Sequence, residues 1–278
     1  MKKTFKIFFR ELYNDHLRLT IYLSLILFFF FNITDHEIDF FLKLFIIAGL
    51  ISRITTHFLF WLVIGITLSF YHFSEWFIID NHIYLMIYWA FNLSVVLYTD
   101  NKHEALVLSS KLLVGLCFFF ATFWKMITPE FMDGTFFTYL LIGGDTRFEW
   151  FSILISGMNA GLIETNQSAM DSVKSVVYNG EQIPVEITSD INSIALFMVW
   201  WTIILEGAIA LLFLMSLYTN KDLFAHLLLM TFIVSTYPVA TVITFGILLT
   251  CIGYGANTSQ ILKLLYMIIF VFLLILQT

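Results

Sequence analysis

The sequence has few charged residues, few cysteines and few prolines, and each scarcity excludes a class of protein. Charged residues make up only 12% of its 278 residues, whereas soluble domains carry about 25%. With 60% hydrophobic residues, the chain has more apolar surface than one soluble core can bury. A soluble fold is therefore excluded, and the composition predicts a protein of the lipid bilayer.

The two cysteines, Cys117 and Cys251, both lie inside apolar runs and not in loops. They predict neither a disulfide framework nor a thiolate metal site. Among the prolines only Pro238 interrupts an apolar run, and the sequence has no internal repeat. Because secondary transporters are built from repeats with paired broken helices, a transporter is the least favoured function.

Apolar runs make up most of the chain, and they predict an all-α polytopic membrane bundle. A membrane-spanning helix needs roughly 20 apolar residues. The run 40–52 is short and Pro238 divides the run 223–254, so we expect eight or nine transmembrane helices in a single membrane domain, 1–278. The candidate spans are 19–33, 40–52, 57–78, 83–98, 107–126, 193–217, 223–236, 238–254 and 260–277.

The basic residues predict the orientation of the chain, because lysine and arginine are retained on the cytoplasmic side of a membrane. If the N-terminus is cytoplasmic, ten of the 14 basic residues lie on that side. The N-terminal residues contain no compact apolar stretch followed by a small-residue cleavage site, so we expect them to be retained. The sequence thus predicts a multi-pass protein of the plasma membrane.

One long segment has the composition of a soluble region. Residues 129–192 carry nine acidic residues against two basic ones, and we interpret 143–192 as an extracytoplasmic insertion that caps the bundle. Runs rich in valine and isoleucine flank Asn179-Gly180, which is typical of a β-hairpin. The negative charge argues against binding to nucleic acids or to anionic lipids.

A lone lysine follows the apolar run in the stretch FFFATFWKMITPEFMDG, residues 118–134. A cation at the centre of a span costs about 2.5 to 3.5 kcal/mol, so such a residue usually faces a partner or a cavity. Lys125 would point back toward the bilayer, because helical side chains lean toward the N-terminus of their own helix. The alternative is that it interacts with the negative end of the helix dipole and reaches the interface.

Further polar residues are expected on the same side of the membrane. His72 and Glu75 are three residues apart and share a helix face, and Asn81 and His82 begin the next helix. These four could converge with Lys125, or His72 and Glu75 could form an interfacial pair. A metal site is not predicted, since no strong ligand motif is present.

Glu206, in the run VWWTIILEGAIALLF, is the carboxylate that lies deepest in an apolar segment. Two interpretations stay open for it: a buried contact between packed helices, or a functional acid. The aromatic runs, such as FFFF at 28–31, are interpreted as lipid-facing or packing residues and predict no cofactor site.

Two of these stretches together resemble a known family. DNHIYLMIYWAFNL, residues 80–93, followed by FFFATFWKMITPEFMDG, is similar to the motif pair in the membrane domain shared by vitamin K-dependent gamma-glutamyl carboxylase and its bacterial relatives, the HTTM (horizontally transferred transmembrane) family. The similarity extends over residues 78–140. The residues in matching places are Asn81, His82, Tyr84, Leu85, Ala90, Phe91, Lys125 and Gly134.

The resemblance implies a cofactor and roles for individual residues. Lys125 would be the base that deprotonates a quinone-like cofactor in its hydroquinone form, since an amine buried beside an apolar quinol stays neutral. His82 would handle a proton or polarise the cofactor, and Asn81 would position it. The remaining residues expected to bind the cofactor or substrate are Tyr84, His72, Glu75 and Glu206.

Two functions follow from these observations. The chain could be a carboxylase-like enzyme of a bacterial plasma membrane, a lyase or oxidoreductase that acts on a quinone-like lipid or modifies a peptide. It could instead be a non-enzymatic partner subunit that serves the maturation or export of a secreted or membrane peptide or protein, which it would contact through its acidic cap.

Overall fold

The protein is all-α over the residues that its structure describes. The computed structural model describes residues 15–30, 36–73, 81–144, 148–174, 185–188, 190–219, 222–239 and 242–277. These ranges contain thirteen α-helices and no strand, which confirms the all-α prediction for this part of the chain. The predicted hairpin around Asn179-Gly180 lies outside the described residues.

Among the described helices, three are long and apolar enough to cross a membrane: α6 (Lys102–Ile127), α11 (Ile191–Ser216) and α14 (Gln260–Gln277). Helices of 13 to 15 residues reach only about 20 to 23 Å, which is less than the roughly 30 Å of a hydrocarbon core. The described part of the chain therefore has three clear candidate spans, fewer than the eight or nine predicted. The shorter apolar helices are α2 (His16–Phe30), α4 (Phe58–His72), α12 (Leu223–Thr236) and α13 (Ile243–Gly255).

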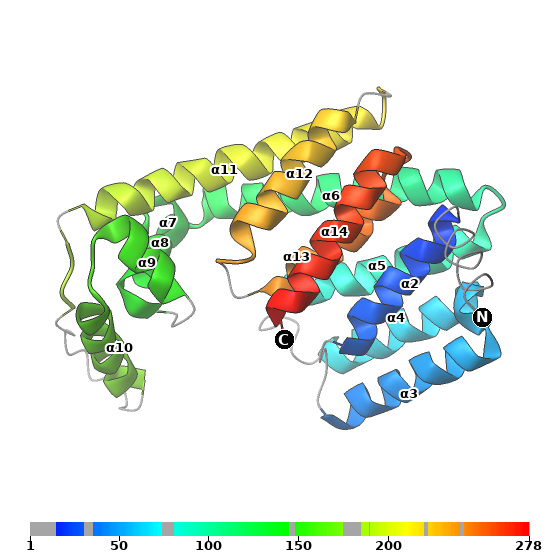
Figure 1. Ribbon diagram of the computed structural model, residues 1–278, viewed down its shortest axis with the longest axis horizontal. Helices are drawn as coiled ribbons and strands as arrows, with labels where there is room; N and C mark the ends of the chain where they lie inside the picture. Colours follow the sequence, from blue (N-terminus) through cyan, green and yellow to red (C-terminus); the bar gives the residue numbers. More distant parts are fainter. Residues whose placement is uncertain are drawn as a thin grey trace, which may run out of the picture.

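The helices form a main bundle and a smaller group at one end of it (Figure 1). Two further helices complete the bundle, α3 (His36–Ser52) and α5 (Asn81–Tyr98). The smaller group, called the cap here, packs against the first half of α11 through a separate hydrophobic cluster. The cap consists of α7 (Pro129–Met132), α8 (Thr135–Tyr139), the π-helical turn η3 (Leu140–Gly144), α9 (Glu149–Ser156) and α10 (Ala160–Lys174).

The helices α6 and α11 form the most extensive helix pair of the bundle. Each has 26 residues and is therefore about 39 Å long. Small residues allow the two backbones to approach: an added Cβ at Gly115 would lie 2.8 Å from Leu214 Cδ2, and one at Gly207 would lie 3.6 Å from Thr122 Cγ2. This close packing places side chains of α6 beside side chains of α11.

The chain turns from α6 into the cap within a few residues. Pro129 occupies the first turn of α7, where its missing N–H leaves no hydrogen bond unmade. Gly134 then adopts a left-handed conformation with φ of 85°, which glycine tolerates without strain. Asp133 accepts a hydrogen bond from the Thr135 backbone N–H at 2.8 Å, and this bond holds the pKa of Asp133 below its usual range.

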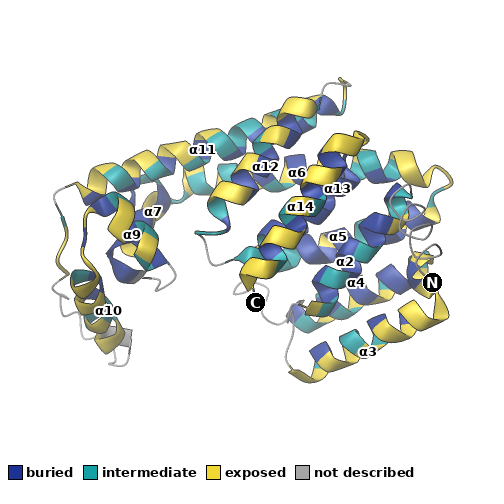
Figure 2. Ribbon diagram, viewed as in Figure 1, coloured by how far each residue is buried: buried dark blue, intermediate teal, exposed yellow. Residues whose placement is uncertain are grey.

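Large apolar side chains cover much of the outer surface of the bundle. Figure 2 shows exposed residues along the outward faces of α3, α11 and α14. Ile51 and Phe70 are each 79% exposed, and Ile261 is 74% exposed. Contiguous apolar surface of this kind is rare on soluble monomers and is suited to contact with lipid.

Candidate functional site

The two ionisable residues that the sequence singled out in apolar runs are in direct contact. Lys125 lies in the last turn of α6, and Glu206 lies in the second half of α11. Lys125 Nζ donates a hydrogen bond to Glu206 Oε1 and forms an ion pair with it. The interpretation of Glu206 as a helix-packing contact and its interpretation as a functional acid both remain possible with this pairing.

The surroundings of the two charged groups are not equivalent. The Lys125 side chain is 26% exposed, whereas the Glu206 side chain is 6% exposed. The second carboxylate oxygen, Glu206 Oε2, is buried and has no hydrogen-bond partner among the described residues. Lys125 Nζ also lies 5.5 Å from the ring centroid of Phe131, within range of a cation–π contact.

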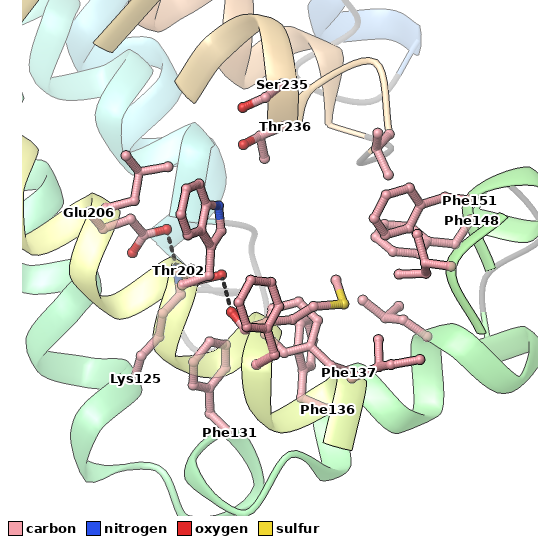
Figure 3. A pocket seen from close by; sticks show the side chains of 18 of the residues that line it. Lys125, Phe131, Phe136, Phe137, Phe148, Phe151, Thr202, Glu206, Ser235 and Thr236 are labelled. Carbon is pink, nitrogen blue, oxygen red and sulfur yellow. Dashed lines mark hydrogen bonds and ion pairs between the residues drawn. The ribbon is translucent and has the colours of Figure 1, made fainter. Parts of the chain in front are cut away.

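The ion pair lies in the wall of a cavity of about 1050 Å³ between the main bundle and the cap. Side chains from α6, from the cap helices, from α11 and from α12 line it. Figure 3 shows Phe131, Phe136 and Phe137 on one side of the open space, Phe148 and Phe151 opposite, and Ser235 and Thr236 at a third side. The other aromatic lining residues are Trp124, Phe197, Trp201 and Phe232.

The cavity reaches the outer surface of the protein. Trp124, Phe197 and Trp201 line it and are 65%, 67% and 58% exposed. Two exposed acids, Glu130 and Asp190, also line it. Aromatic and aliphatic side chains together make up most of the lining, which is suited to a largely apolar ligand.

The residues of the Asn-His element lie elsewhere. Asn81, His82 and Tyr84 are in the first turn of α5, and none of these described residues lines the cavity. The His82 ring centroid lies 6.4 Å from that of Phe245, on α13. His72 is buried at the end of α4, also outside the cavity lining.

A chain of aromatic contacts connects His82 to the cavity. Phe245 contacts Tyr237 with ring centroids 5.7 Å apart, and Tyr237 contacts Phe232, a lining residue, at 5.8 Å. The structure thus brings Lys125 and Glu206 together and places His82 behind these rings. Glu75 lies outside the described residues, and the roles assigned to all of these residues stay predictions.

Sequence reasoning missed the aromatic lining. Phe136, Phe137, Phe148 and Phe151 lie in the segment interpreted as acidic and soluble, and its composition concealed a packed hydrophobic cluster. The paired phenylalanines in DGTFFTY were the available signal, because two large rings between polar residues indicate local burial.

A second group of buried polar residues lies toward the other end of α6. Lys111 Nζ lies 2.7 Å from Asp222 Oδ2, and His226 Nε2 lies 3.8 Å from the same oxygen. His226 Nδ1 is 2.9 Å from the Tyr266 hydroxyl. Nothing in the sequence indicated this cluster.

Within the described ranges, His, Cys, Asp and Glu side chains do not gather in groups of three that could hold a metal ion. The lining of the cavity offers an ammonium, three carboxylates and several hydroxyls beside its aromatic rings. Comparison of the chain with protein-family models, with curated proteins and with solved structures finds no match.

Proposed function

We propose that the chain is a multi-pass protein of the plasma membrane that holds a lipid-soluble molecule with an acidic hydroxyl, of the hydroquinone class, in the aromatic cavity. Lys125 would exchange a proton with that hydroxyl. The observation that carries this proposal is the Lys125–Glu206 ion pair in the wall of a cavity lined mainly by aromatic and aliphatic side chains. The resemblance to the carboxylase-like HTTM family points to the same chemistry.

The cavity has the properties that a hydroquinone requires. Flat rings stack favourably on aromatic side chains, and nine of the lining residues are aromatic. A ligand hydroxyl would meet the ammonium and carboxylate in the wall. When bound, a hydroquinone supplies an acidic hydroxyl and an electron-rich ring; the protein supplies the charged pair.

The position of the pair favours an enzyme over a transporter. Two buried apolar side chains, Phe118 of α6 and Phe213 of α11, lie along the helix pair between Glu206 and the Lys111–Asp222 pair. Apolar rings carry no group that can relay a proton, so their position supports proton exchange on the cavity side. With a cytoplasmic N-terminus that is the outer side.

We further propose that the four shorter apolar helices, together with α3 and α5, bring the three long helices to a bundle of eight or nine membrane segments. The exposed apolar surface of the bundle supports this arrangement, because such a surface would be unstable in water. The cap would lie at the outer end of the bundle, since it follows the C-terminal end of α6.

The test is binding of a naphthohydroquinone with a short isoprenyl chain, kept reduced under anaerobic conditions, to the purified protein in lipid nanodiscs. Quenching of tryptophan fluorescence would report binding, because Trp124 and Trp201 line the cavity. Lys125→Met is expected to weaken binding about tenfold or more, since a hydrogen bond to a charged group is worth about 1.5 to 3 kcal/mol.

Lys43→Met is the matched control. Lys43 pairs with Asp39 on α3 and does not line the cavity, so this variant is expected to bind as the wild type does. Equal affinity of the wild type and Lys125→Met, or an absence of saturable binding, would contradict the proposal.

The alternative function, a partner subunit, has one structural observation in its favour. Glu164 and Asp171 are exposed on α10 and lie seven residues apart, so they share one face of that helix. A basic peptide could contact this face. Replacement of both acids by glutamine should then abolish co-purification with the peptide, and unchanged co-purification would exclude this function.

A further inference from the structure

The ion pair in the cavity wall constrains which residue accepts a proton. The ion pair places the Lys125 ammonium in contact with the Glu206 carboxylate. An ammonium has three N–H donors and no lone pair. Lys125 can therefore take a proton from a ligand only if it gives up one of its own.

The geometry provides a place for that proton. Lys125 is the more exposed member of the pair and lines the cavity, whereas Glu206 is nearly buried. One N–H of Lys125 already points at Glu206 Oε1. The carboxylate has spare capacity as well, because its other oxygen has no partner among the described residues.

We infer that Glu206 is the proton acceptor of this site and that Lys125 passes a proton to it and then holds the resulting oxyanion. This inference rests on the proposed function. In the step, Lys125 Nζ bonds to the ligand's hydroxyl proton, and the electrons of that O–H bond stay on the ligand. At the same time the Nζ–H bond toward Glu206 breaks, and an O–H bond forms on Oε1.

The charges in the cavity favour this route. Before the step the ion pair consists of one cation and one anion; after it, the ammonium faces the ligand's oxyanion and Glu206 is neutral. Release of the proton to water would instead leave two anions beside one cation in an apolar cavity, which is costly. The protonated form also suits Glu206, because burial disfavours a charged carboxylate.

The experiment uses a para-nitrophenol that carries a hexyl chain, bound to the full-length protein in nanodiscs at a pH where the free probe is neutral. Visible absorption reports the nitrophenolate, and infrared difference spectra report the C=O stretch of a newly protonated carboxyl group. We expect both signals in the wild type in equal amount, with no proton released to the medium. The methyl ether of the probe should give neither signal.

Two substitutions identify the carboxyl group. Glu206→Gln should lose the infrared band and release about one proton per bound probe, since the ammonium then captures the phenolate alone. Glu130→Gln, which changes an exposed acid in the lining of the same cavity, should keep the band. If Glu206→Gln does not fold, the wild-type protein can be produced with its glutamate labelled by a heavy carbon isotope, and the infrared band must then shift. Labelling of aspartate in the same way must leave the band unshifted.

The outcomes separate the inference from the function on which it rests. Nitrophenolate without a carboxyl band, or a band that persists in Glu206→Gln or ignores labelled glutamate, would overturn the assignment of Glu206 while leaving the proposed binding function intact. A probe that does not bind, or that ionises equally in Lys125→Met, would remove the proposed function as well.

Discussion

Lys111 and Lys125 lie fourteen residues apart on α6, which separates them by about 21 Å and places them on nearly the same side of the helix. Each is in contact with an acid from a neighbouring segment, Asp222 for Lys111 and Glu206 for Lys125. An apolar helix tolerates two cations because both are paired. The difference between them is that only the second pair lies in the wall of the aromatic cavity.

The first pair predicts a stability effect at the residue scale. Asp222→Asn would leave the buried Lys111 ammonium without a counter-charge, and we expect it to lower the free energy of unfolding by about 1 to 3 kcal/mol, less than for a fully buried pair because Asp222 is 23% exposed. Thermal unfolding in detergent measures the change. Asp15→Asn is the control, because Asp15 and its partner Arg18 form an ion pair in which the side chains are 42% and 52% exposed. An equally large decrease in the free energy of unfolding for Asp15→Asn would contradict the explanation.

Individual site residues were predictable where charge stands out from its surroundings. Lys125 and Glu206 interrupt apolar runs, and an ionisable residue in such a run is rare enough to indicate a site. Their contact was not predictable, since it depends on how α6 and α11 pack. The convergence of His82 with Lys125 was expected from topology alone, yet Phe245 and Tyr237 lie between His82 and the cavity lining.

At the scale of the elements, α11 connects the two hydrophobic clusters. Ile191, Ala195 and Val199, spaced by four residues, face the cap, whereas Ile209 and Phe213 face the main bundle. The cavity lies between these sets, and Glu206 is on the segment that joins them. The helical period was visible in the sequence, but the change of packing partner along one helix was not.

The packing of α6 on α11 can be tested with two matched glycine substitutions. Gly115→Ala would place its Cβ 2.8 Å from Leu214 Cδ2 and 2.9 Å from Leu214 Cγ, so either the Leu214 side chain must shift or the helices must separate. We expect it to be less stable than Gly207→Ala, whose Cβ would make an ordinary contact, by about 1 to 3 kcal/mol. Thermal unfolding of both variants in one detergent gives the comparison. Equal stability would show that the α6–α11 interface accommodates the added methyl group without cost.

The cap was the element that the sequence described least well. Its acidic composition gave no indication of the hydrophobic cluster over which its described helices pack, and the predicted hairpin lies outside the described residues. Composition averages over a segment and does not register a few well-placed rings. Hydrogen bonds also connect α10 to the segment that precedes α11: Asn166 donates to the Glu186 carbonyl at 2.8 Å and accepts from the Glu186 N–H at 3.0 Å.

At the scale of the whole molecule, the proposed orientation predicts which surfaces a reagent can reach. Ser168 is exposed on α10, and Asn101 is exposed just before α6. In intact cells, Ser168→Cys should react with a membrane-impermeant maleimide, whereas Asn101→Cys should react only after permeabilisation. The native Cys251 is buried and Cys117 is partly buried, so background labelling should be low. The reverse pattern would place the cap inside the cell.

The length of α11 has a consequence for access to the cavity. A continuous helix of about 39 Å exceeds a hydrocarbon core of roughly 30 Å, so its first turns, and the cap attached to them, belong at the level of the lipid headgroups. The exposed rings of Trp124, Phe197 and Trp201 would then face the neighbouring acyl chains. A hydrophobic molecule could then enter the cavity laterally from the membrane leaflet and return to the leaflet without passing through water.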